Sequence, residues 1–340
     1  MKTLRVAITG VGNVGSRIGG ALEERAPEFA RRFNADVRVV GVSASTEGLI
    51  DGSGISGERI AGRTDFVSGL TGQRFFDELE ADVLIEAGPS NYVDGAPGLS
   101  HLEAALEGSM DVICVSKGAL VVAGDDIYRR AAEAERQVRV SGAAASAMPT
   151  VDFLTYDLAG AQVTRFEALL TGTTTFVLDT MYRHGWDLDD AVAEAQESGI
   201  AEPQPEFDVD GWDTAAKLVV IARAVFNAGI PIESVPRQSV KNVNEEQIDC
   251  WKQHDIVPRL VGILELDDSD RVTASVQVKC YPKSHPFSLA EGSMKAVNVS
   301  TKRMGDYSLL GGASSLDATA AAAIKDLEHI LTCRMSSSVQ

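Results

Sequence analysis

Short apolar runs alternate with helical patterns along the first 140 residues. The apolar runs are nearly continuous, as expected for strands buried on both faces, and lie at 4–9, 36–43, 82–87, 111–115 and 137–140. Helical patterns between them lie at 16–22, 97–108 and 124–136. The glycine-rich stretch 48–63 lacks clear periodicity and is predicted to be a loop with a short helix. Strands that alternate with helices predict an α/β, Rossmann-type, doubly wound sheet.

The pattern changes after residue 163. Strands are predicted at 164–170, 271–281 and 294–299. Helices are predicted after the turn 171–175 through Met181, at 188–198 and at 212–229, with a mixture of loop and further helix at 230–260. Grouped strands and helices are typical of an α+β domain with an open sheet. Because one face of such a sheet needs cover, we expect a second copy of the chain to supply it, which gives a homodimer.

A glycine loop at 310–315 precedes a last helix at 317–331. So far from the first domain in sequence, it is interpreted as a return to the ligand cleft, with Gly312 near the cofactor. The alternative is a C-terminal docking helix after an ordinary turn. The predicted division is a dinucleotide-binding domain at 1–140 plus 305–335, and a substrate-binding and dimerisation domain at 141–304.

The first strand leads into a glycine-rich turn that has the dinucleotide fingerprint GxGxxG. The turn stands between a strand and a helix, as the fingerprint requires, and its predicted cofactor contacts are Gly10, Gly12, Asn13, Val14 and Gly15. Gly10 permits the tight turn, Gly12 lets the backbone approach a pyrophosphate, and Gly15 lets the helix pack closely. The phosphates then meet the positive end of the helix. A turn without a ligand would leave the three glycines unexplained.

The tip of the second strand bears on the choice between NAD and NADP. Here the chain reads Ser43-Ala44-Ser45-Thr46, without the acid that usually binds the adenosine ribose. An acid would repel a 2′-phosphate, so its absence leaves NADP open. No arginine follows immediately to bind that phosphate, so NADP is not required either. The prediction is therefore NADP or NAD, with Ser43 at the ribose.

Two further strand tips carry candidate residues on the cofactor side of the sheet. The third strand of the parallel series ends before Gly88-Pro89-Ser90-Asn91, and the fourth ends before Ser116-Lys117-Gly118. Ligands bind outside the carboxyl ends of such strands. We therefore predict that Pro89, Ser90 and Ser116 contact the cofactor and that Lys117 faces the reaction. The alternative for Lys117 is an ordinary surface lysine.

The stretch 201–217, AEPQPEFDVDGWDTAAK, carries five carboxylates and ends on a lysine. Asp213 and Lys217 are four residues apart, which places them on one face of a helix within ion-pair reach. That face continues into apolar residues, so the pair is expected beside a buried surface, where acids and amines are candidates for proton transfer. The alternative is a helix N-terminus that carries acids because of the helix dipole.

A hydroxyl-rich turn, Thr171-Gly172-Thr173-Thr174-Thr175, follows the first strand of the second domain. Such a turn at a helix N-terminus either caps the helix or binds an anionic group. Thr173 is the member of the turn predicted to contact substrate.

Composition excludes several classes of protein. The chain has 340 residues, a net charge of −18 and a pI near 4.7, which argues against a nucleic-acid partner. No apolar stretch is long enough to cross a membrane, and the N-terminus lacks the features of a signal peptide. Four scattered cysteines form neither a disulfide framework nor a metal-ligand pattern. A cytoplasmic protein that acts on a small molecule is expected.

These stretches, in this order, resemble the homoserine dehydrogenase family. The resemblance covers nearly the whole chain, and 201–218 is its most specific part; the matching stretches are 10–15, 86–106, 115–120, 169–181, 201–218, 285–297 and 311–327. The chain stops at 340 without an added amino-acid-sensing domain, so it resembles the short form of the family. The resemblance implies oxidation of homoserine to aspartate 4-semialdehyde by NAD(P)⁺, in the biosynthesis of threonine and methionine.

Site residues follow from the resemblance position by position. It implies that Glu202 holds the substrate ammonium, that Asp208 and Asp213 face the substrate, and that Lys117 and Lys217 handle the proton. Hydride transfer comes from the cofactor, whereas the protein positions the substrate and moves the proton. A primary alcohol must lose its proton as the hydride leaves, and a lysine amine is able to take it.

The chain departs from the family pattern at three places around the expected pocket. Ser141 followed by GAAASAM, with alanine at 143–145 and 147, replaces an acid and a glycine-rich run. The family associates that acid with sodium, so no metal is predicted here. Thr171 and Ser116 each replace an asparagine. These changes leave open a different small hydroxy compound or aldehyde as the substrate.

Two alternative functions remain. One is a related dehydrogenase for another alcohol, and the other is a non-catalytic dinucleotide-sensing protein. A binding module has no need of Glu202, Asp213, Lys217 and Lys117 together, which argues against the second. The enzyme hypothesis requires the acidic run and Lys217 to fold against the nicotinamide held by the first glycine turn.

Overall fold

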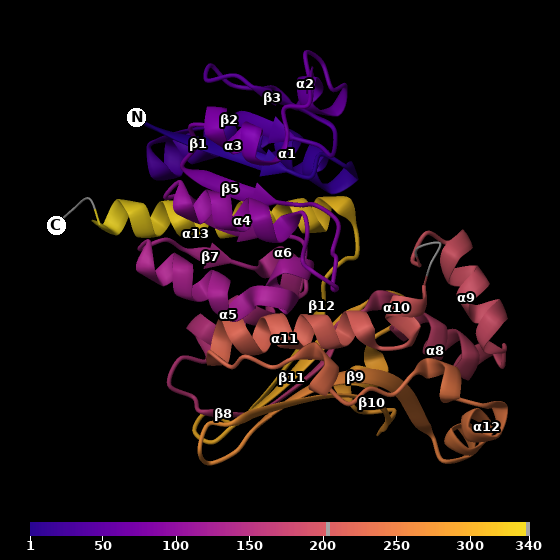
Figure 1. Cartoon of the computed structure of the whole chain (residues 1–340). Helices are drawn as coiled ribbons and strands as arrows, with labels where there is room; N and C mark the ends of the chain where they lie inside the picture. The colour runs from indigo at the N-terminus through magenta and orange to yellow at the C-terminus, as the bar shows by residue number, and fades with distance from the viewer. Residues whose placement is uncertain (202–204, 338–340) are drawn as a thin grey trace. The chain divides into compact units, whose positions relative to one another are not determined.

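A computed structural model describes residues 1–201 and 205–337, which divide into two compact units (Figure 1). Unit 1 consists of Met1–Ala147 and the chain from Ser315 onward. Unit 2 consists of Met148–Ser314. Each unit has its own sheet, so the two are described separately.

The sheet of unit 1 has seven strands in the order β4-β3-β2-β1-β5-β6-β7. The strands are β1 (Lys2–Thr9), β2 (Ala35–Ser43), β3 (Glu47–Ile50), β4 (Val67–Ser68), β5 (Val83–Glu86), β6 (Asp111–Cys114) and β7 (Val138–Arg139). β1 pairs in parallel with β2 and β5, and the parallel series continues through β6 to β7, whereas β3 and β4 add antiparallel strands. This confirms the predicted doubly wound sheet. Winding reverses at β1, where such folds bind their ligands.

Helices cover the sheet of unit 1 and give it a continuous core. They are α1 (Asn13–Phe33), α2 (Gly57–Ala61), α3 (Gly72–Glu78), α4 (Gly98–Glu107), α5 (Gly118–Glu133), α6 (Ser141–Ala144) and α13 (Leu316–Ser337). Ile18 of α1 and Leu327 of α13 are fully buried with Ile8 of β1 in one apolar cluster. The last helix, in yellow in Figure 1, contacts α1, α6 and β6 and therefore completes the core of the first unit.

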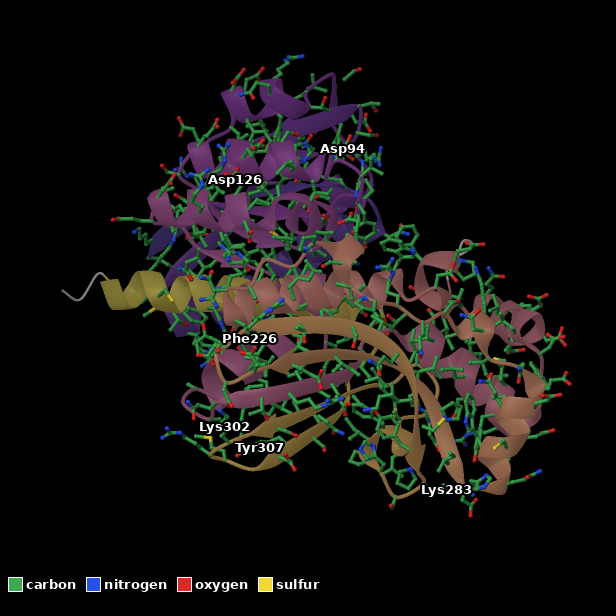
Figure 2. All side chains as sticks on the ribbon, turned by 60° about the horizontal axis from the view of Figure 1, so that its bottom comes forward. Asp94, Asp126, Phe226, Lys283, Lys302 and Tyr307 are labelled. Atoms are coloured by element: carbon green, nitrogen blue, oxygen red, sulfur yellow. The ribbon has the colours of Figure 1, made fainter. Side chains whose placement is uncertain are left out.

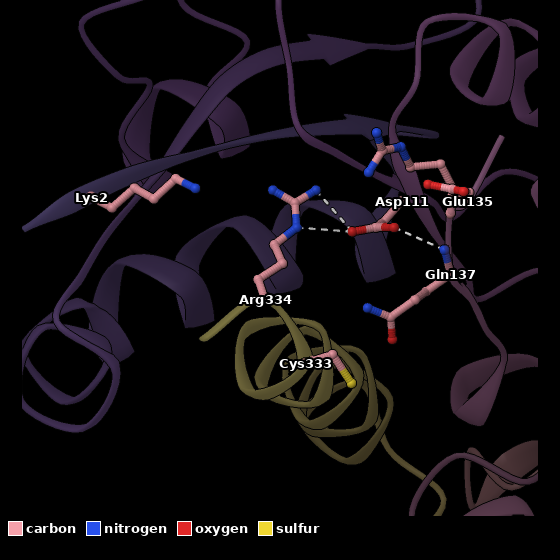
Figure 3. Close-up of a pocket in the computed structure, with 7 residues that line it drawn as sticks. Lys2, Asp111, Glu135, Gln137, Cys333 and Arg334 are labelled. Atoms are coloured by element: carbon pink, nitrogen blue, oxygen red, sulfur yellow. Dashed lines mark hydrogen bonds and ion pairs between the residues drawn. The ribbon is translucent and has the colours of Figure 1, made fainter. Parts of the chain in front are cut away.

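Polar contacts secure α13 at its middle and near its C-terminal end. Ser141 donates from its backbone N–H and its hydroxyl to the two oxygens of Asp326, at 2.9 and 2.7 Å. Near the C-terminus Arg334 binds Asp111 through two nitrogens, at 3.0 and 2.8 Å, beside a cavity of about 400 Å³ (Figure 3). Asp111 begins β6, so this cavity lies at the N-terminal ends of the strands. The candidate cofactor residues lie at the opposite, C-terminal ends.

The sheet of unit 2 has five antiparallel strands in the order β10-β9-β8-β11-β12. The strands are β8 (Val163–Leu169), β9 (Ile256–Leu266), β10 (Val272–Pro282), β11 (Lys295–Thr301) and β12 (Asp306–Gly311). The helices are α7 (Thr150–Asp152), α8 (Gly172–His184), α9 (Leu188–Glu197), α10 (Glu206–Val209), α11 (Trp212–Phe226) and α12 (Glu245–Gln253). Short π and 3₁₀ turns lie at 153–157, 232–234, 240–242 and 286–289. The antiparallel sheet confirms an α+β second domain.

Two strands of this sheet differ from the sequence prediction. β9 begins at Ile256, so the predicted mixture of loop and helix is wrong for 256–260, whereas α12 and the 3₁₀ turns confirm it for the earlier part of the stretch 230–260. β9 is buried on both faces: α11 covers Gly262, and Val261 packs with Phe287 on the other side. A strand without polar alternation cannot be told from a buried helix by periodicity. β12 was not predicted as a strand: residues 305–335 were assigned to the first domain, with a glycine loop at 310–315, whereas β12 pairs with β11 in unit 2.

Long-range contacts also secure the margins of the second sheet. The ring of Tyr307 on β12 packs edge-on against Phe153, with centroids 6.0 Å apart, and Lys302 pairs with Asp268 at 2.7 Å (Figure 2).

None of the helices that the structure describes in either unit is long and apolar enough to cross a membrane.

Candidate active site

The glycine turn of unit 1 has three glycines with three different physical roles. Gly10 has φ of +87°, and a Cβ there would lie 2.3 Å from the backbone nitrogen of Gly88. A Cβ on Gly15 would lie 2.2 Å from the carbonyl oxygen of Gly10. At Gly12, by contrast, a Cβ would meet nothing within 4 Å. Gly10 and Gly15 are thus required by the fold itself, whereas only an incoming ligand gives a reason for glycine at Gly12.

The end of helix α1 that follows this turn is ready to receive an anion. Gly12 is its N-cap residue and offers no side-chain cap, so the first N–H groups are left for another partner. A 21-residue helix presents the positive end of its dipole there. Asn13 is exposed beside the turn, and Val14 packs partly into the core. The fingerprint therefore has the local geometry of a phosphate cradle.

The adenosine end of this cradle includes an arginine that the sequence analysis missed. Arg63 donates to the carbonyl oxygen of Val11 at 3.1 Å and pairs with Glu47 at 3.0 Å. Ser43 is buried at the tip of β2, where its hydroxyl donates to Ala44 at 3.3 Å. Arg63 follows β2 by twenty positions in a glycine-rich stretch, so no local pattern indicated its position.

The tips of β5 and β6 are joined by a buried carboxyl group. Glu86 is 1% exposed and accepts from the Ser116 hydroxyl at 2.5 Å and from the Gly88 backbone N–H at 2.8 Å. Burial raises the pKa of Glu86, and these two neutral donors only partly offset it. The Lys117 backbone N–H donates to the Ser90 hydroxyl at 3.0 Å. The structure thus brings Ser90, Ser116 and Lys117 together at two neighbouring strand tips.

Lys117 occupies the N-cap position of α5 and is partly buried. The following Gly118 lies so close to Asn91 that a Cβ would approach its backbone to 2.5 Å. Lys117 is therefore held at a strand tip by tight packing of two loops, which an ordinary surface lysine does not require. Pro89 is exposed at the same edge.

The site in unit 2 is assembled around the turn between β8 and α8. The Thr171 hydroxyl donates to Asp213 at 2.9 Å and lies 3.2 Å from the hydroxyl of Thr214. The hydroxyls of Thr174 and Thr175 donate back to the Thr171 carbonyl. The hydroxyl-rich turn therefore makes hydrogen bonds within the first turn of α8, without a side-chain cap at Thr171, and also supports the carboxylate of Asp213 on α11.

The ion pair expected from the spacing of Asp213 and Lys217 is confirmed. The Lys217 Nζ lies 2.5 Å from Asp213 Oδ2, and each side chain is 14% exposed. Lys217 also donates to the carbonyl oxygen of Leu170 at 2.9 Å. The next turns of α11 are buried, so this pair sits at the margin of an apolar face rather than in open solvent.

The remaining predicted substrate residues have different outcomes. Thr173 is buried, with its hydroxyl donating to Ile200 at 3.3 Å. Asp208 is partly buried on the short helix α10. Glu202 lies outside the described residues. Gly312 has φ of +80° and belongs to unit 2, after β12.

The departures around residue 141 have a structural explanation. Ser141 is buried and binds Asp326, so an acid is present there, but it comes from α13. Ala143 and Ala144 are fully buried beneath the same helix. Among residues 1–201 and 205–337, no group of three or more His, Cys, Asp or Glu side chains is arranged to hold a metal ion.

Chemically, the two units carry complementary groups. Unit 1 offers backbone N–H groups for a pyrophosphate and a lysine at a strand tip. Unit 2 offers the largely buried ion pair of Asp213 and Lys217, which lies beside the hydroxyl group of Thr171. An anionic dinucleotide and a small polar substrate are the ligands that these groups fit.

Sequence models of one family match both parts of the chain. The model of homoserine dehydrogenase matches residues 149–327, and the model of the homoserine dehydrogenase NAD-binding domain matches residues 10–141. An NAD(+)-dependent homoserine dehydrogenase from Pseudomonas canavaninivorans is 25% identical, covering 97% of each chain. Homoserine dehydrogenase from Mycobacterium bovis is 28% identical over 96% of this chain and 72% of its own length.

Solved structures share the fold. A homoserine dehydrogenase from Thiobacillus denitrificans superposes with a TM-score of 0.87 at 23% identity, covering 99% of this chain and 75% of that one. A putative homoserine dehydrogenase from Archaeoglobus fulgidus gives a TM-score of 0.86 at 23% identity, covering 96% and 99%. Since one of the two family models alone spans more than half of the chain, the chain belongs to the homoserine dehydrogenase family, the nicotinamide-dependent oxidoreductases that act on a CH–OH group.

Proposed function

We propose that this protein is the homoserine dehydrogenase of its cell and catalyses the reversible oxidation of L-homoserine to L-aspartate 4-semialdehyde. The observation that carries the proposal is the cluster of Thr171, Asp213 and Lys217 at one end of the second sheet. A dinucleotide-sensing protein has no use for a half-buried lysine held by both an aspartate and a backbone carbonyl. That arrangement suits a group that exchanges a proton.

Lys217 has the right number of donors for this role. An ammonium group has three N–H bonds, and two of them are directed at Asp213 and at the Leu170 carbonyl. The third is left to donate to a substrate oxygen. In the reductive direction Lys217 therefore gives a proton to the alkoxide that forms at the former aldehyde carbon. In the oxidative direction the neutral amine takes the proton back from the hydroxyl, so charge and protons balance.

Asp213 and Thr171 position that amine. Asp213 stabilises the ammonium form, and the Thr171 hydroxyl holds the carboxylate from its other side. When bound, the nicotinamide supplies and accepts the hydride. We propose that Lys117, held at the strand tip of unit 1, assists the same proton transfer, and that Glu202, Asp208 and Thr173 bind the substrate.

A substrate screen tests the assignment. Purified protein is assayed by the absorbance of the reduced nicotinamide, with L-homoserine and L-aspartate 4-semialdehyde in the two directions. Related alcohols such as L-serine, L-threonine and 4-hydroxybutanoate serve as comparison substrates. We expect turnover with homoserine to exceed that with the others. Turnover with another alcohol and none with homoserine would assign a different substrate, and turnover with none of them would favour a sensing protein.

We infer that both NAD and NADP serve as cofactors. The tip of β2 carries Ser43 rather than an acid, so the residue at that tip does not itself repel a 2′-phosphate. Arg63 offers a cation at the glycine turn, but its ion pair with Glu47 keeps a negative charge beside it. Replacing Arg63 by Ala should weaken NADP several-fold, as expected for one exposed charge contact, and leave NAD nearly unchanged. Equal losses of both cofactors would show that Arg63 only supports the turn.

A cytoplasmic homodimer is the expected working form. β12 is an edge strand, and its Tyr307 and Leu310 are 37% and 38% exposed. Exposed apolar groups on an open sheet edge favour pairing with another chain. Light scattering on the purified protein gives the mass directly, and a monomer at micromolar concentration would contradict this part of the proposal.

A further inference from the structure

The cavity of about 400 Å³ at the base of the first sheet is lined by polar side chains and lies away from the glycine turn. Its lining residues all belong to unit 1 and come from the start of β1, the start of β6, the turn between α5 and β7, and the last turn of α13. The glycine turn follows the opposite, C-terminal end of β1. A cavity of this size is large enough for a small ligand, and no step of the proposed reaction uses it.

Arg136 is the lining residue that calls for a ligand. Its Nε is buried without a hydrogen-bond partner, and in the described part of the chain no acid forms an ion pair with its guanidinium group. Arginine remains charged in proteins and has only donors to offer. Buried donors in native proteins nearly always have a partner, so an orphaned one points to a water or an ion that occupies the site.

Two further cations border the same cavity. Lys2 is exposed at the start of β1 and forms no ion pair among the described residues. Arg334 lies in the last turn of α13 and is bound to Asp111. Figure 3 shows the ammonium group of Lys2 and the guanidinium group of Arg334 pointing toward one another. Like charges repel, and an anion between them removes that repulsion.

The acids of the cavity leave an excess of positive charge. Asp111 is 2% exposed and accepts from two nitrogens of Arg334 and from the Gln137 backbone N–H at 2.8 Å, so its charge is already matched. Glu135 is exposed, and water screens its carboxylate. Three cations therefore face two acids in the lining, in a chain whose net charge is −18.

The placement of the cations favours phosphate over carboxylate as the anion. Lys2, Arg136 and Arg334 stand on three different segments, namely β1, the turn between α5 and β7, and α13. A phosphate group presents three strong acceptor oxygens that point in different directions, whereas a carboxylate presents two in one plane. Donors that approach from several sides are therefore better satisfied by phosphate, and arginine binds it through strong, charge-assisted hydrogen bonds.

We propose that this cavity binds a small phosphate-bearing anion through Arg136, Lys2 and Arg334. The bound anion joins the first strand, the turn before β7 and the last helix, and so fastens α13 to the base of the sheet. It stabilises the folded protein, because the unfolded chain does not hold the three cations together. The site is separate from the glycine turn, and it does not depend on which alcohol the enzyme oxidises.

Calorimetric titration of the whole protein with sodium phosphate tests the proposal. The titration is done at constant ionic strength, with NAD present so that the glycine turn is occupied. Wild-type protein should bind phosphate saturably. Arg136→Gln should weaken this binding about tenfold or more, the size expected for hydrogen bonds from a charged group. Lys2→Gln should weaken it by a smaller factor, because Lys2 is exposed.

Two matched variants control for charge. Arg129→Gln removes an exposed arginine of α5 that pairs with Asp126 outside the cavity, and it should leave the phosphate affinity unchanged. Glu135→Gln removes an acid from the lining and should keep or strengthen the binding. Phosphate should also raise the melting temperature of wild-type protein by about 2–4 °C at saturation. The general stabilising effect of phosphate acts on all variants alike, so the difference between variants reports the site.

Parallel titrations with glycerol phosphate, AMP and succinate identify the ligand. Tighter binding of a phosphate ester than of inorganic phosphate assigns the phosphoryl group of a metabolite, and the reverse order assigns the free ion. Succinate that binds as tightly as phosphate overturns the choice of phosphate.

The site itself has a simple criterion. Absence of saturable phosphate binding in wild-type protein, or equal affinities in wild type and Arg136→Gln, overturns it. Should Arg136→Gln fail to fold, Lys2→Gln decides by the same criterion. Oxidation of homoserine is not a readout here, so the outcome is independent of the proposed function.

Discussion

In unit 1 the candidate cofactor turn is made of six consecutive residues and offers mainly its backbone to a ligand. In unit 2 the candidate substrate site draws on β8, α8 and α11, and offers side chains. Gly10 and Gly15 sit against backbone atoms that would collide with any side chain. Thr171, Asp213 and Lys217 instead meet through hydrogen bonds between segments about forty residues apart. A site formed by the backbone of one short turn tolerates substitutions outside that turn. A site assembled from side chains of several segments keeps its geometry only if those segments keep their positions in the fold.

Two buried glutamates repeat the contrast. Glu86 in unit 1 has only neutral donors, and burial raises its pKa. Burial of Glu167 in unit 2 acts in the same direction, but Lys279 and Arg165 donate to it, so the net effect is a lowered pKa. The carboxyl group of Glu167, which has cations within reach, is therefore held in its charged form, whereas that of the more deeply buried Glu86, which has only neutral donors, resists ionisation.

The largest effect should come from the assembled site. Replacing Lys217 by Ala removes the proton donor, and we expect kcat to fall at least about a hundredfold. Cofactor affinity should be retained, because the glycine turn lies in the other unit. Steady-state kinetics with a parallel cofactor titration measure both. Lys241→Ala, which removes an exposed ion pair with Asp210, is the matched control. Unchanged turnover in Lys217→Ala would remove Lys217 from the mechanism.

The backbone site should respond differently at neighbouring glycines. Gly12→Ala adds a methyl group that meets nothing in the protein, so thermal stability should be nearly unchanged while affinity for the dinucleotide falls about tenfold or more. Gly10→Ala places a methyl group against Gly88 at a positive φ and should lower the melting temperature itself. Calorimetry and cofactor titration separate the two effects. Equal destabilisation by both changes would contradict a ligand-related role for Gly12.

Thr171 tests how far the substrate site depends on its supporting hydrogen bond. Thr171→Val keeps the shape but removes the hydroxyl that donates to Asp213. We expect kcat to fall by about tenfold, the value of one hydrogen bond to a charged group, with little change in cofactor affinity. Thr171→Ser restores the hydroxyl and should recover most of the activity. If Val and Ser behave alike, the hydroxyl does not position Asp213.

The glutamates give the smallest effects, and these have opposite signs. Because the folded-state pKa of Glu167 lies below its ordinary value of 4.5, its contribution to stability is present above that value and is lost as pH falls through the folded pKa. Glu167→Gln should therefore cost about 1–3 kcal/mol near neutral pH and progressively less in acid. Urea unfolding at several pH values measures this loss.

Glu86→Gln provides the reversed case. The raised pKa of Glu86 means that wild-type protein loses stability as pH rises from 4.5 through the folded pKa. The glutamine cannot ionise, so the variant should gain stability relative to wild type over that range. Parallel pH profiles for the two variants would contradict the assignment of opposite shifts.

The sequence by itself determined the parts of this protein that depend on neighbouring residues. The glycine turn at 10–15 follows from backbone sterics within one strand–helix unit, and the Asp213–Lys217 pair follows from the helical repeat. The resemblance to the family also rests on such contiguous stretches. Even the departure at Ser141 was visible in the sequence, although its partner Asp326 was not.

Only the tertiary structure decided the contacts that depend on strand register and on the packing of segments far apart in sequence. It showed that β9 is a strand, since its two buried faces erase the polar alternation that would have revealed it. It brought Arg63 to the glycine turn and Arg334 to Asp111, although neither belongs to a local pattern. The physical reason is that side-chain periodicity reports which face is buried, whereas the identity of the neighbour across the sheet is set by chain segments far away in sequence.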